Sequence, residues 1–278
     1  MLAAAAKINL NLLVGRRRDD GFHEIDSLAA RITLYDHVRL SARDDGRIGF
    51  TCTGADCGSD EDNLALLAAR LLSQIAPERG ADVLLAKGIP PGSGLGGASA
   101  DAAAVLAGLC ELWGANVSAG QLFELALRLG SDVPFFLGPP AARMTGRGDL
   151  IEPVNVHPFW AVLYLGGPAC PTTAVYRAFD QLSRSPCEQV DPASLAQPPS
   201  RWRGVMRNQL LPAARGVSGE LGRALDRLSE SLPAPVCMTG SGGALFVLCD
   251  DLAEARAVLH RVPADMRGGC CIVRSNVW

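Results

Sequence analysis

A glycine-rich segment over residues 88–98 has the residue types that are best suited to binding a polyphosphate. It contains five glycines and two prolines, and it leads directly into an alanine-rich stretch that favours a helix. Glycine lets backbone amides approach a ligand closely, and a helix N-terminus adds a partial positive charge. The segment therefore predicts an anion site at the junction of a loop and a helix.

The glycine-rich segment has three alternative interpretations. Gly92, Gly94 and Gly97 satisfy the GxGxxG spacing of dinucleotide-binding folds, but two prolines precede them and the acid at a comparable offset, Glu111, lies on the helix itself. A Walker A loop needs Gly-Lys-Ser/Thr at the helix start, where this chain has GGA. A plain glycine turn stays open as an alternative, although it does not explain the abrupt junction with a strong helix.

A lysine near the N-terminus and an aspartate near residue 130 have the chemistry for phosphoryl transfer. Lys7, Asn9 and Asn11 share one face of an alternating stretch whose other face is apolar, which is the pattern of a half-buried strand. Asp132 lies in SDVPFF, among unusually apolar neighbours. An ammonium can neutralise phosphate charge and a carboxylate can accept a hydroxyl proton. The alternative is that Lys7 lies on a solvated strand face and Asp132 is only a helix cap.

The elements that must position these residues indicate an α+β fold with antiparallel character, in two halves that meet near residue 150. Strands are predicted over residues 6–12, 32–40, 47–52, 82–86, 160–165, 235–239, 244–249 and 271–273. Helices are predicted after Asp62 or Asn63, after the glycine-rich segment, after Ser118, near Val133, over 174–182, within 205–232 and after Asp251. A second glycine turn, Gly240 to Gly243, is either a simple hairpin or a supporting contact for a ligand.

The composition is that of a globular protein with a large core. The 278 residues are 48% apolar and 20% charged, and the formal net charge is −3. This charge balance provides no general basic field, so nonspecific nucleic-acid binding is disfavoured. The nine cysteines lack zinc-ligand spacing and are expected to be reduced thiols. No stretch has the length and apolarity of a membrane helix, so we expect a cytoplasmic protein with no membrane partner.

Three segments together resemble the three motifs of the GHMP kinases: AKINL, PPGSGLGGASADAA and TGSGGALF. They occur in the family's order over nearly the whole chain. The longer segments AKINLNLLVGRRRDDGFHEIDSL, KGIPPGSGLGGASADAAAVL and LGSDVPFFL look most like the branch that phosphorylates a cytidyl-linked methylerythritol. The resemblance implies a two-domain GHMP kinase fold. A ribosomal-S5-like, ATP-binding half would cover residues 1–150, and a ferredoxin-like half would cover residues 151–278.

The resemblance also implies a reaction and a set of site residues. The reaction would be ATP-dependent phosphorylation of the 2-hydroxyl of 4-diphosphocytidyl-2-C-methyl-D-erythritol, a step of the non-mevalonate isoprenoid precursor pathway, with Mg²⁺ accompanying ATP. Lys7 and Asp132 match the catalytic pair. The matching ATP-binding positions are Pro90, Pro91, Gly92, Ser93, Gly94, Leu95, Gly96, Gly97, Ala98 and Ser99. The matching substrate-binding positions are Asn9, Phe22, His23, Thr172 and Tyr176.

Two positions depart from the family pattern. The pair that would hold the cytosine is Phe22 and His23, where relatives often have tyrosine in place of Phe22, and Tyr176 would form the second aromatic wall. Many relatives have GGGSS where this chain reads GGASA, so Ser99 is the only hydroxyl left there. We therefore assign no metal ligand from the sequence.

Two rival functions remain open at this stage. A kinase of the same family that acts on homoserine or a mevalonate derivative is the nearest rival. A non-catalytic nucleotide sensor or an RNA-binding module, suggested by the basic run Arg16 to Arg18, is the rival of another class. The expected partner is the small-molecule substrate, with no nucleic acid, and the expected assembly is a monomer or a weak homodimer.

Overall fold

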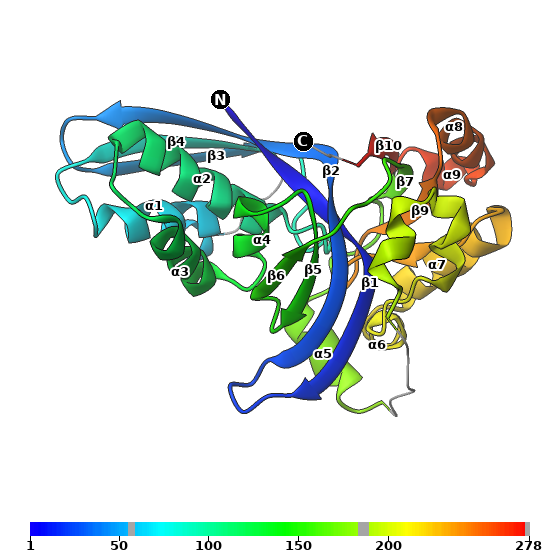
Figure 1. The fold of residues 1–278 in the computed structure, drawn as a ribbon. Coiled ribbons are helices and arrows are strands. Elements are labelled where there is room, and N and C mark those ends of the chain that lie inside the picture. Colours follow the sequence, from blue (N-terminus) through cyan, green and yellow to red (C-terminus); the bar gives the residue numbers. More distant parts are fainter. Residues whose placement is uncertain (55–58, 183–188, 276–278) are drawn as a thin grey trace. The chain divides into compact units, whose positions relative to one another are not determined.

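A computed structural model describes residues 1–54, 59–182 and 189–275 of the chain (Figure 1). Helices and mixed strands alternate along it, which confirms the α+β prediction. The chain forms two compact units: unit 1 is Met1–Ala6, Leu34–Pro91 and Gly96–Pro139, and unit 2 is Lys7–Thr33, Gly92–Leu95 and Pro140–Trp278. The units interleave along the sequence, whereas the predicted domains are consecutive. The division at residue 150 therefore stays a prediction about the family's domains.

Unit 1 packs helices against a small mixed sheet. Its strands are the second part of β2 (His23–Arg43), β3 (Ile48–Gly54) and β4 (Gly80–Lys87). β3 pairs parallel with β4, and β4 pairs antiparallel with β2, with Arg39 opposite Leu84. Its helices are η1 (Asp60–Asp62), α1 (Leu64–Ser73), α2 (Gly97–Trp113), α3 (Ala119–Leu129) and α4 (Val133–Leu137).

Local sequence signals explain where the helices of unit 1 begin. The Asn63 side chain accepts a hydrogen bond from Ala65 N and caps α1, and Ser118 forms a capping box with Gln121 at the start of α3. Both caps were predicted. The apolar faces of α1 and α2 share one core with β4, and Leu72 is fully buried in it.

Unit 2 contains two sets of antiparallel strands. The first set comprises most of β1 (Leu2–Arg17), the first part of β2, β5 (Ala141–Gly146) and β6 (Leu150–Pro153), and it belongs to the same six-stranded sheet as β3 and β4. The second has the order β10 (Cys270–Arg274), β7 (Trp160–Tyr164), β9 (Leu245–Cys249) and β8 (Cys237–Met238). The helices of the unit are α5 (Thr172–Phe179), η2 (Pro192–Ala196), η3 (Pro199–Arg201), η4 (Arg203–Val205), α6 (Leu211–Val217), α7 (Gly219–Ser231), α8 (Leu252–Arg261) and α9 (Ala264–Arg267). Helices α6, α7 and α8 share a core with the second sheet (Figure 1).

The strands extend further than the sequence signals indicated. β1 spans Leu2–Arg17, whereas the strand was predicted over residues 6–12 only, because the two long strands β1 and β2 pair with each other. β5 and β6 were not predicted. β5 has the sequence AARMTG, which lacks a run of β-branched residues, and it is a strand because it pairs with β2, with Ala142 opposite Ala29.

Two expectations from composition can be compared with the described residues. No helix among them combines the length and apolarity that crossing a bilayer requires. Free thiols are found at Cys110, Cys170, Cys237, Cys249, Cys270 and Cys271. The expectation of a reduced thiol is wrong at Cys52, which forms a disulfide bond.

Candidate active site

The glycine-rich segment forms the loop between β4 and α2, as predicted. Gly92, Gly94 and Gly96 have φ values of 67°, 76° and 73°, in the left-handed region that favours glycine. Gly96 is the N-cap residue of α2, and within the described chain no side chain caps this helix end. The first backbone N–H groups of α2 are therefore free of a capping side chain, which suits an anion. Binding of ATP to residues 90–99 stays a prediction.

The second glycine turn, residues 240–243, packs against Gly92–Leu95 of the first loop. It joins β8 to β9, so the hairpin interpretation is correct. Thr239 Oγ1 lies 3.2 Å from the carbonyl oxygen of Gly94, and a Cβ added to Gly94 would lie 2.2 Å from Thr239 O. The turn is thus both a hairpin and a close support for the first loop, and its contact with a ligand stays a prediction.

Lys7 and Asn9 lie side by side on β1, as the alternation predicted. Lys7 Nζ donates to Asn9 Oδ1 at 2.6 Å. Asn9 Oδ1 also accepts from Gly240 N at 2.9 Å, and Asn9 Nδ2 donates to Ser27 Oγ at 2.7 Å. Lys7 is 5% exposed, so the alternative of a solvated surface lysine is wrong. The bonds of the Asn9 amide hold the lysine ammonium in place, while contact of Asn9 with a substrate stays a prediction.

Backbone and hydroxyl contacts tie β1 to both glycine segments. Lys7 N donates to Leu95 O at 2.9 Å. Thr239, which is fully buried, accepts from Asn9 N at 3.1 Å, and its hydroxyl lies 3.2 Å from both Asn9 Oδ1 and Gly94 O. The single hydroxyl proton can go to only one of these oxygens at a time. Thr239 was not identified from the sequence, and its only signal is its position directly before GSGG.

Asp132 occupies the N-cap position of α4 in unit 1, but its side chain makes no capping hydrogen bond within the described chain. The interpretation of Asp132 as a plain helix cap is therefore not supported. Its helix begins Val133–Pro134, in agreement with the helix predicted near Val133, and a proline suits the first turn of a helix. Lys7 belongs to unit 2, and the pairing of Lys7 with Asp132 in catalysis stays a prediction.

His23 and Tyr176 lie together, although they are far apart in the sequence. Their ring centroids are 5.1 Å apart, and the Phe179 ring lies 6.2 Å from His23. His23 Nε2 is 2.7 Å from Asp180 Oδ1, and the imidazole is buried. Asp180 was not identified from the sequence. A carboxylate bonded to one ring nitrogen fixes the orientation of the imidazole, so this group can present a defined edge to a ligand.

Thr172, at the start of α5, is linked to the second glycine turn. Its Oγ1 lies 2.9 Å from Ser241 Oγ, and either hydroxyl can be the donor. Thr172 lies one turn of α5 before Tyr176, so both residues face the same side of this helix. The two substrate-binding candidates on α5 therefore connect the aromatic group to the glycine turn.

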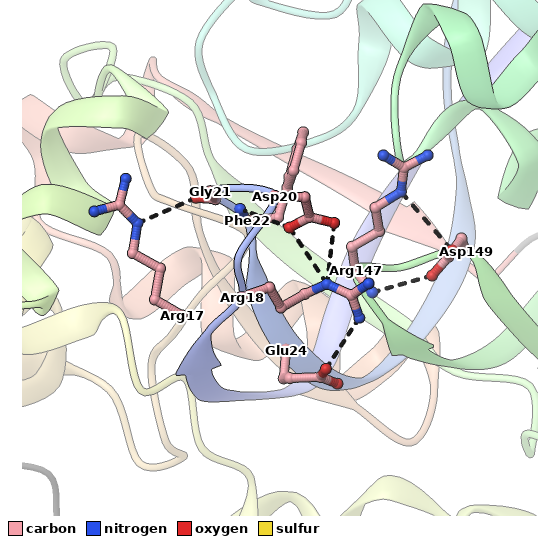
Figure 2. A network of polar contacts seen from close by, with 8 residues as sticks. All are labelled: Arg17, Arg18, Asp20, Gly21, Phe22, Glu24, Arg147 and Asp149. Atoms are coloured by element: carbon pink, nitrogen blue, oxygen red, sulfur yellow. Dashed lines mark hydrogen bonds and ion pairs between the residues drawn. The ribbon is translucent and has the colours of Figure 1, made fainter.

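Phe22 lies in the turn between β1 and β2, in a network of charged residues (Figure 2). It is 48% exposed, so it is not a core aromatic. The Arg147 guanidinium lies 5.4 Å from the centre of the Phe22 ring, within the range of a cation–π contact. Arg18 bonds both Asp20, at 3.1 Å, and Glu24, at 3.0 Å. The Phe22 ring is thus accessible at the surface, and its contact with the cytosine of a substrate stays a prediction.

Comparisons with known proteins agree over the length of the chain. Residues 63–138 match the GHMP kinases N terminal domain, and residues 199–268 match the GHMP kinases C terminal domain. The 4-diphosphocytidyl-2-C-methyl-D-erythritol kinase of Thiobacillus denitrificans is 39% identical, over 95% of this chain and 92% of the relative. The enzyme of the same name from Salinibacter ruber is 36% identical, over 95% of each chain.

Solved structures give the same result for the fold. A crystal structure of 4-(cytidine 5'-diphospho)-2C-methyl-D-erythritol kinase matches with a TM-score of 0.80 and 34% identity, over 99% of this chain and 98% of the other. The mevalonate kinase of L. major matches with a TM-score of 0.66 and 15% identity, over 99% and 95% of the two chains, which shows a shared fold alone. The predicted GHMP kinase fold is confirmed, and the chain belongs to the 4-diphosphocytidyl-2-C-methyl-D-erythritol kinase family of the GHMP kinases.

Proposed function

We propose that this chain transfers the γ-phosphoryl group of ATP to the 2-hydroxyl of 4-diphosphocytidyl-2-C-methyl-D-erythritol, in the pathway that makes isoprenoid precursors without mevalonate. The observation that carries the proposal is the 39% identity to a kinase of that name over 95% of the chain. Such a reaction needs a site for the triphosphate, a cation beside the transferred phosphate and a site for the cytidine. The glycine loop, the buried Lys7 and the aromatic residues around His23 suit these three tasks. The alternative substrates homoserine and mevalonate belong to solved relatives with at most 18% identity.

The triphosphate of ATP is assigned to the first glycine loop and the start of α2. Left-handed glycines leave no Cβ in the way of the phosphates, and the uncapped helix N-terminus offers N–H donors. Hydrogen bonds to residues 92–95 from β1 and from the second glycine turn hold the loop in one conformation before ATP arrives. Such preorganisation avoids an ordering cost when the nucleotide binds.

Lys7 and Asp132 are the proposed catalytic residues. The substrate oxygen forms a bond with the γ-phosphorus, and the bond from that phosphorus to the bridging oxygen breaks, so its electron pair leaves with ADP. The hydroxyl proton goes to the Asp132 carboxylate, and the Lys7 ammonium neutralises charge on the transferred group. The support is the burial of Lys7 and its bond to Asn9, together with the match of Lys7 and Asp132 to the catalytic positions that the family resemblance implies.

The cytidine of the substrate is assigned to the aromatic residues of unit 2. Phe22 and Tyr176 supply faces on which a base can stack, and the imidazole of His23 is oriented by Asp180. Thr172 is linked to the second glycine turn through Ser241. This arrangement favours a substrate that carries a nucleobase over homoserine or mevalonate, which have no aromatic ring.

Mg²⁺ is proposed to arrive with ATP. Magnesium usually keeps several waters and binds phosphate oxygens with one or two side chains, so it does not need a dedicated protein cage. The described residues contain no group of three or more His, Cys, Asp or Glu side chains that could hold a metal ion. Ser99 lies in the first turn of α2, and no metal-binding role is assigned to it. The cytoplasmic location and the monomer or weak homodimer also remain proposals.

The test of substrate identity is a comparison of acceptor alcohols. ADP formation is measured with the cytidyl methylerythritol, homoserine and mevalonate at equal ATP. We expect kcat/KM for the cytidyl substrate to exceed the other two by at least about 1,000-fold, which corresponds to about 4 kcal/mol of transition-state discrimination. Faster turnover of homoserine or mevalonate would reject the proposal.

The test of the catalytic pair is a set of matched variants. Lys7→Met and Asp132→Asn should each lower kcat by about 100-fold to 1,000-fold, because each removes charge that acts on the reacting groups. Asp82→Asn makes the same chemical change at a side chain that is 54% exposed, and it should leave kcat unaltered. Circular dichroism should show that all three variants are folded. A fall in kcat of less than about tenfold, or 1.4 kcal/mol, in a folded variant would reject the role of that residue.

A further inference from the structure

Three charged side chains of unit 1 form a buried set in contact with both ends of the glycine loop. They are Asp36 on β2, Lys87 at the end of β4 and Asp101 in α2, and their side chains are 0%, 6% and 3% exposed. Lys87 Nζ makes an ion pair with Asp36 Oδ2, and it lies 2.7 Å from Asp101 Oδ2. We call these three residues the buried triad. None of them has a role in the reaction described above.

Asp36 holds the N-terminal flank of the glycine loop. One carboxylate oxygen, Oδ1, accepts from Gly88 N at 2.6 Å and from Ile89 N at 2.8 Å. The other oxygen, Oδ2, accepts from the ammonium of Lys87, the residue directly before this flank. Hydrogen bonds from backbone N–H groups to a carboxylate are among the stronger ones. A single carboxylate therefore fixes the direction in which the chain leaves β4.

Lys87 and Asp101 hold the other flank, where α2 begins. A Cβ added to Gly97 would lie 3.2 Å from Lys87 Nζ and 2.9 Å from Ile89 Cγ2. The ammonium therefore lies directly beside the first residue of α2, and the close approach is possible because this residue is glycine. Asp101, one helical turn further on, bonds the same ammonium. The buried triad thus connects both flanks of the loop through one nitrogen atom.

Stability alone does not explain a buried set of this kind. Burying charges is unfavourable, and replacing a buried ion set by apolar side chains of similar volume is often neutral or stabilising. Two ionised carboxylates and one ammonium would also carry a net negative charge. Burial raises the pKa of Asp101 to about 7, against the attraction of Lys87 and with the help of Asp36. Asp101 Oδ1 is buried and has no hydrogen-bond partner among the described residues. A net gain in stability therefore does not account for this arrangement.

We propose that Asp36, Lys87 and Asp101 are positioning residues that set the spacing between the amides at residues 88–89 and the N-terminus of α2, and thereby the affinity for ATP. They act through the loop backbone and do not touch the substrate. This inference rests on the proposed function, because it takes the loop to be the phosphate site. It predicts that damage to the buried triad weakens ATP binding selectively, whereas a purely structural role predicts only a loss of stability.

The test uses Asp36→Ala, Asp36→Asn and a control that destabilises the same unit elsewhere. Leu72→Ala removes a fully buried side chain from the core that α1 shares with β4. Binding of a non-hydrolysable ATP analogue is measured by titration calorimetry on the folded protein, and the midpoint of thermal unfolding is measured for each variant. The KM for the cytidyl substrate at saturating ATP is the third readout.

We expect Asp36→Ala to weaken binding of the analogue by about tenfold or more, and Asp36→Asn by about threefold, because the amide oxygen of asparagine can still accept from the loop. Both variants should keep the KM for the cytidyl substrate within about twofold. Leu72→Ala should lower the unfolding midpoint at least as much as Asp36→Ala does and leave the affinity for the analogue unaltered.

Equal affinity of Asp36→Ala and the unaltered chain for the analogue would overturn the proposal. So would a loss of affinity in Leu72→Ala as large as the loss in Asp36→Ala, since the effect would then follow stability. If Asp36→Ala does not fold, Asp36→Asn decides, and an affinity within about 1.5-fold of the unaltered chain rejects the proposal. Failure of the unaltered chain to bind the analogue would instead overturn the proposed function, and the role of the buried triad with it.

Discussion

At the scale of single residues, buried charges dominate the chemistry of this protein. Lys7 and Lys87 are both withdrawn from solvent, but their surroundings differ. Lys7 donates to the neutral amide of Asn9, whereas Lys87 lies between two carboxylates. An ammonium that lies between two buried carboxyl groups has its charge offset by them, which makes it a poor candidate for neutralising a phosphate. The surroundings of Lys87 therefore favour a positioning role.

The raised pKa of Asp101 predicts a specific dependence of stability on pH. Burial raises this pKa from 3.8 to about 7. The folded state therefore binds more protons than the unfolded state between about pH 4 and about pH 7. The stabilising contribution of the neutral carboxyl is fully present below this range and is lost as pH rises through it. Asp101→Asn is neutral at every pH. As pH rises through this window, the free energy of unfolding of Asp101→Asn, relative to that of the unaltered chain, should therefore increase by up to about 1.4 kcal/mol per pH unit.

Urea unfolding at several pH values between about 5 and about 7, the upper part of this window, measures that difference. Asp226→Asn is the matched control, because a hydrogen bond from Arg215 lowers the pKa of Asp226, and its carboxyl is ionised in both states throughout the range. The difference in free energy of unfolding between this control and the unaltered chain should not change with pH. If the difference for Asp101→Asn does not change with pH either, the raised pKa of Asp101 is contradicted.

The sequence identified the residues with distinctive chemistry but not those that hold them. Lys7, Asn9 and His23 were found because alternation and motif positions single them out. Thr239 is bonded to Asn9 across 230 positions, and Asp180 to His23 across 157 positions. No local pattern reports such pairs, because the partners meet only when distant strands and helices pack. The same reason explains why the buried triad was not predicted.

At the scale of elements, the two glycine segments are parts of one structure. Both have glycines with positive φ, and the backbone of one lies against the backbone of the other. Absence of side chains at Gly94 and Gly240 permits this contact, since a Cβ on either would collide with the other segment. The TGSGG turn therefore supports the first loop by direct backbone contact.

Replacing Gly94 by alanine tests this packing. Its φ of 76° strains any other residue, and the added Cβ would lie 2.2 Å from Thr239 O. We expect Gly94→Ala to lower the free energy of unfolding by about 2 kcal/mol or more. Gly120→Ala makes the same change in helix α3, where a Cβ has no neighbour within 4 Å, and it should stabilise by about 0.5–1 kcal/mol. Denaturant unfolding of both variants provides the measurement. Equal effects of the two substitutions would argue against the contact between the glycine segments.

Elements with strong local signals were predicted well, and elements created by pairing were not. Asn63, the Ser118 capping box and Asp251 mark helix starts that the structure confirms, because a cap is a local hydrogen bond. β5 was missed, since its alanines carry little strand preference and its pairing partner lies more than 100 residues away. Prediction from sequence therefore succeeded where a few neighbouring residues determine the structure.

At the scale of the whole molecule, similarity and composition support the same enzyme class. The near-neutral balance of charge gives no basis for a general affinity for nucleic acid, and the similarity to relatives extends over nearly the whole chain. The three GHMP motifs are local sequences, but they lie in β1, in the first loop with α2, and in the turn between β8 and β9. The fold of unit 2 brings the first and third motifs together at Asn9 and Thr239.

The central claim is the transfer of phosphate from ATP to one particular hydroxyl group, and ³¹P NMR of a reaction mixture tests it directly. We expect the γ-phosphate signal of ATP to disappear as a new phosphomonoester signal grows. Carbon 2 of the substrate bears a methyl group and no hydrogen, so that signal should show no splitting from a proton three bonds away. A split signal would mean that another hydroxyl is the acceptor. Release of inorganic phosphate alone, or unaltered ATP, would contradict the kinase assignment itself.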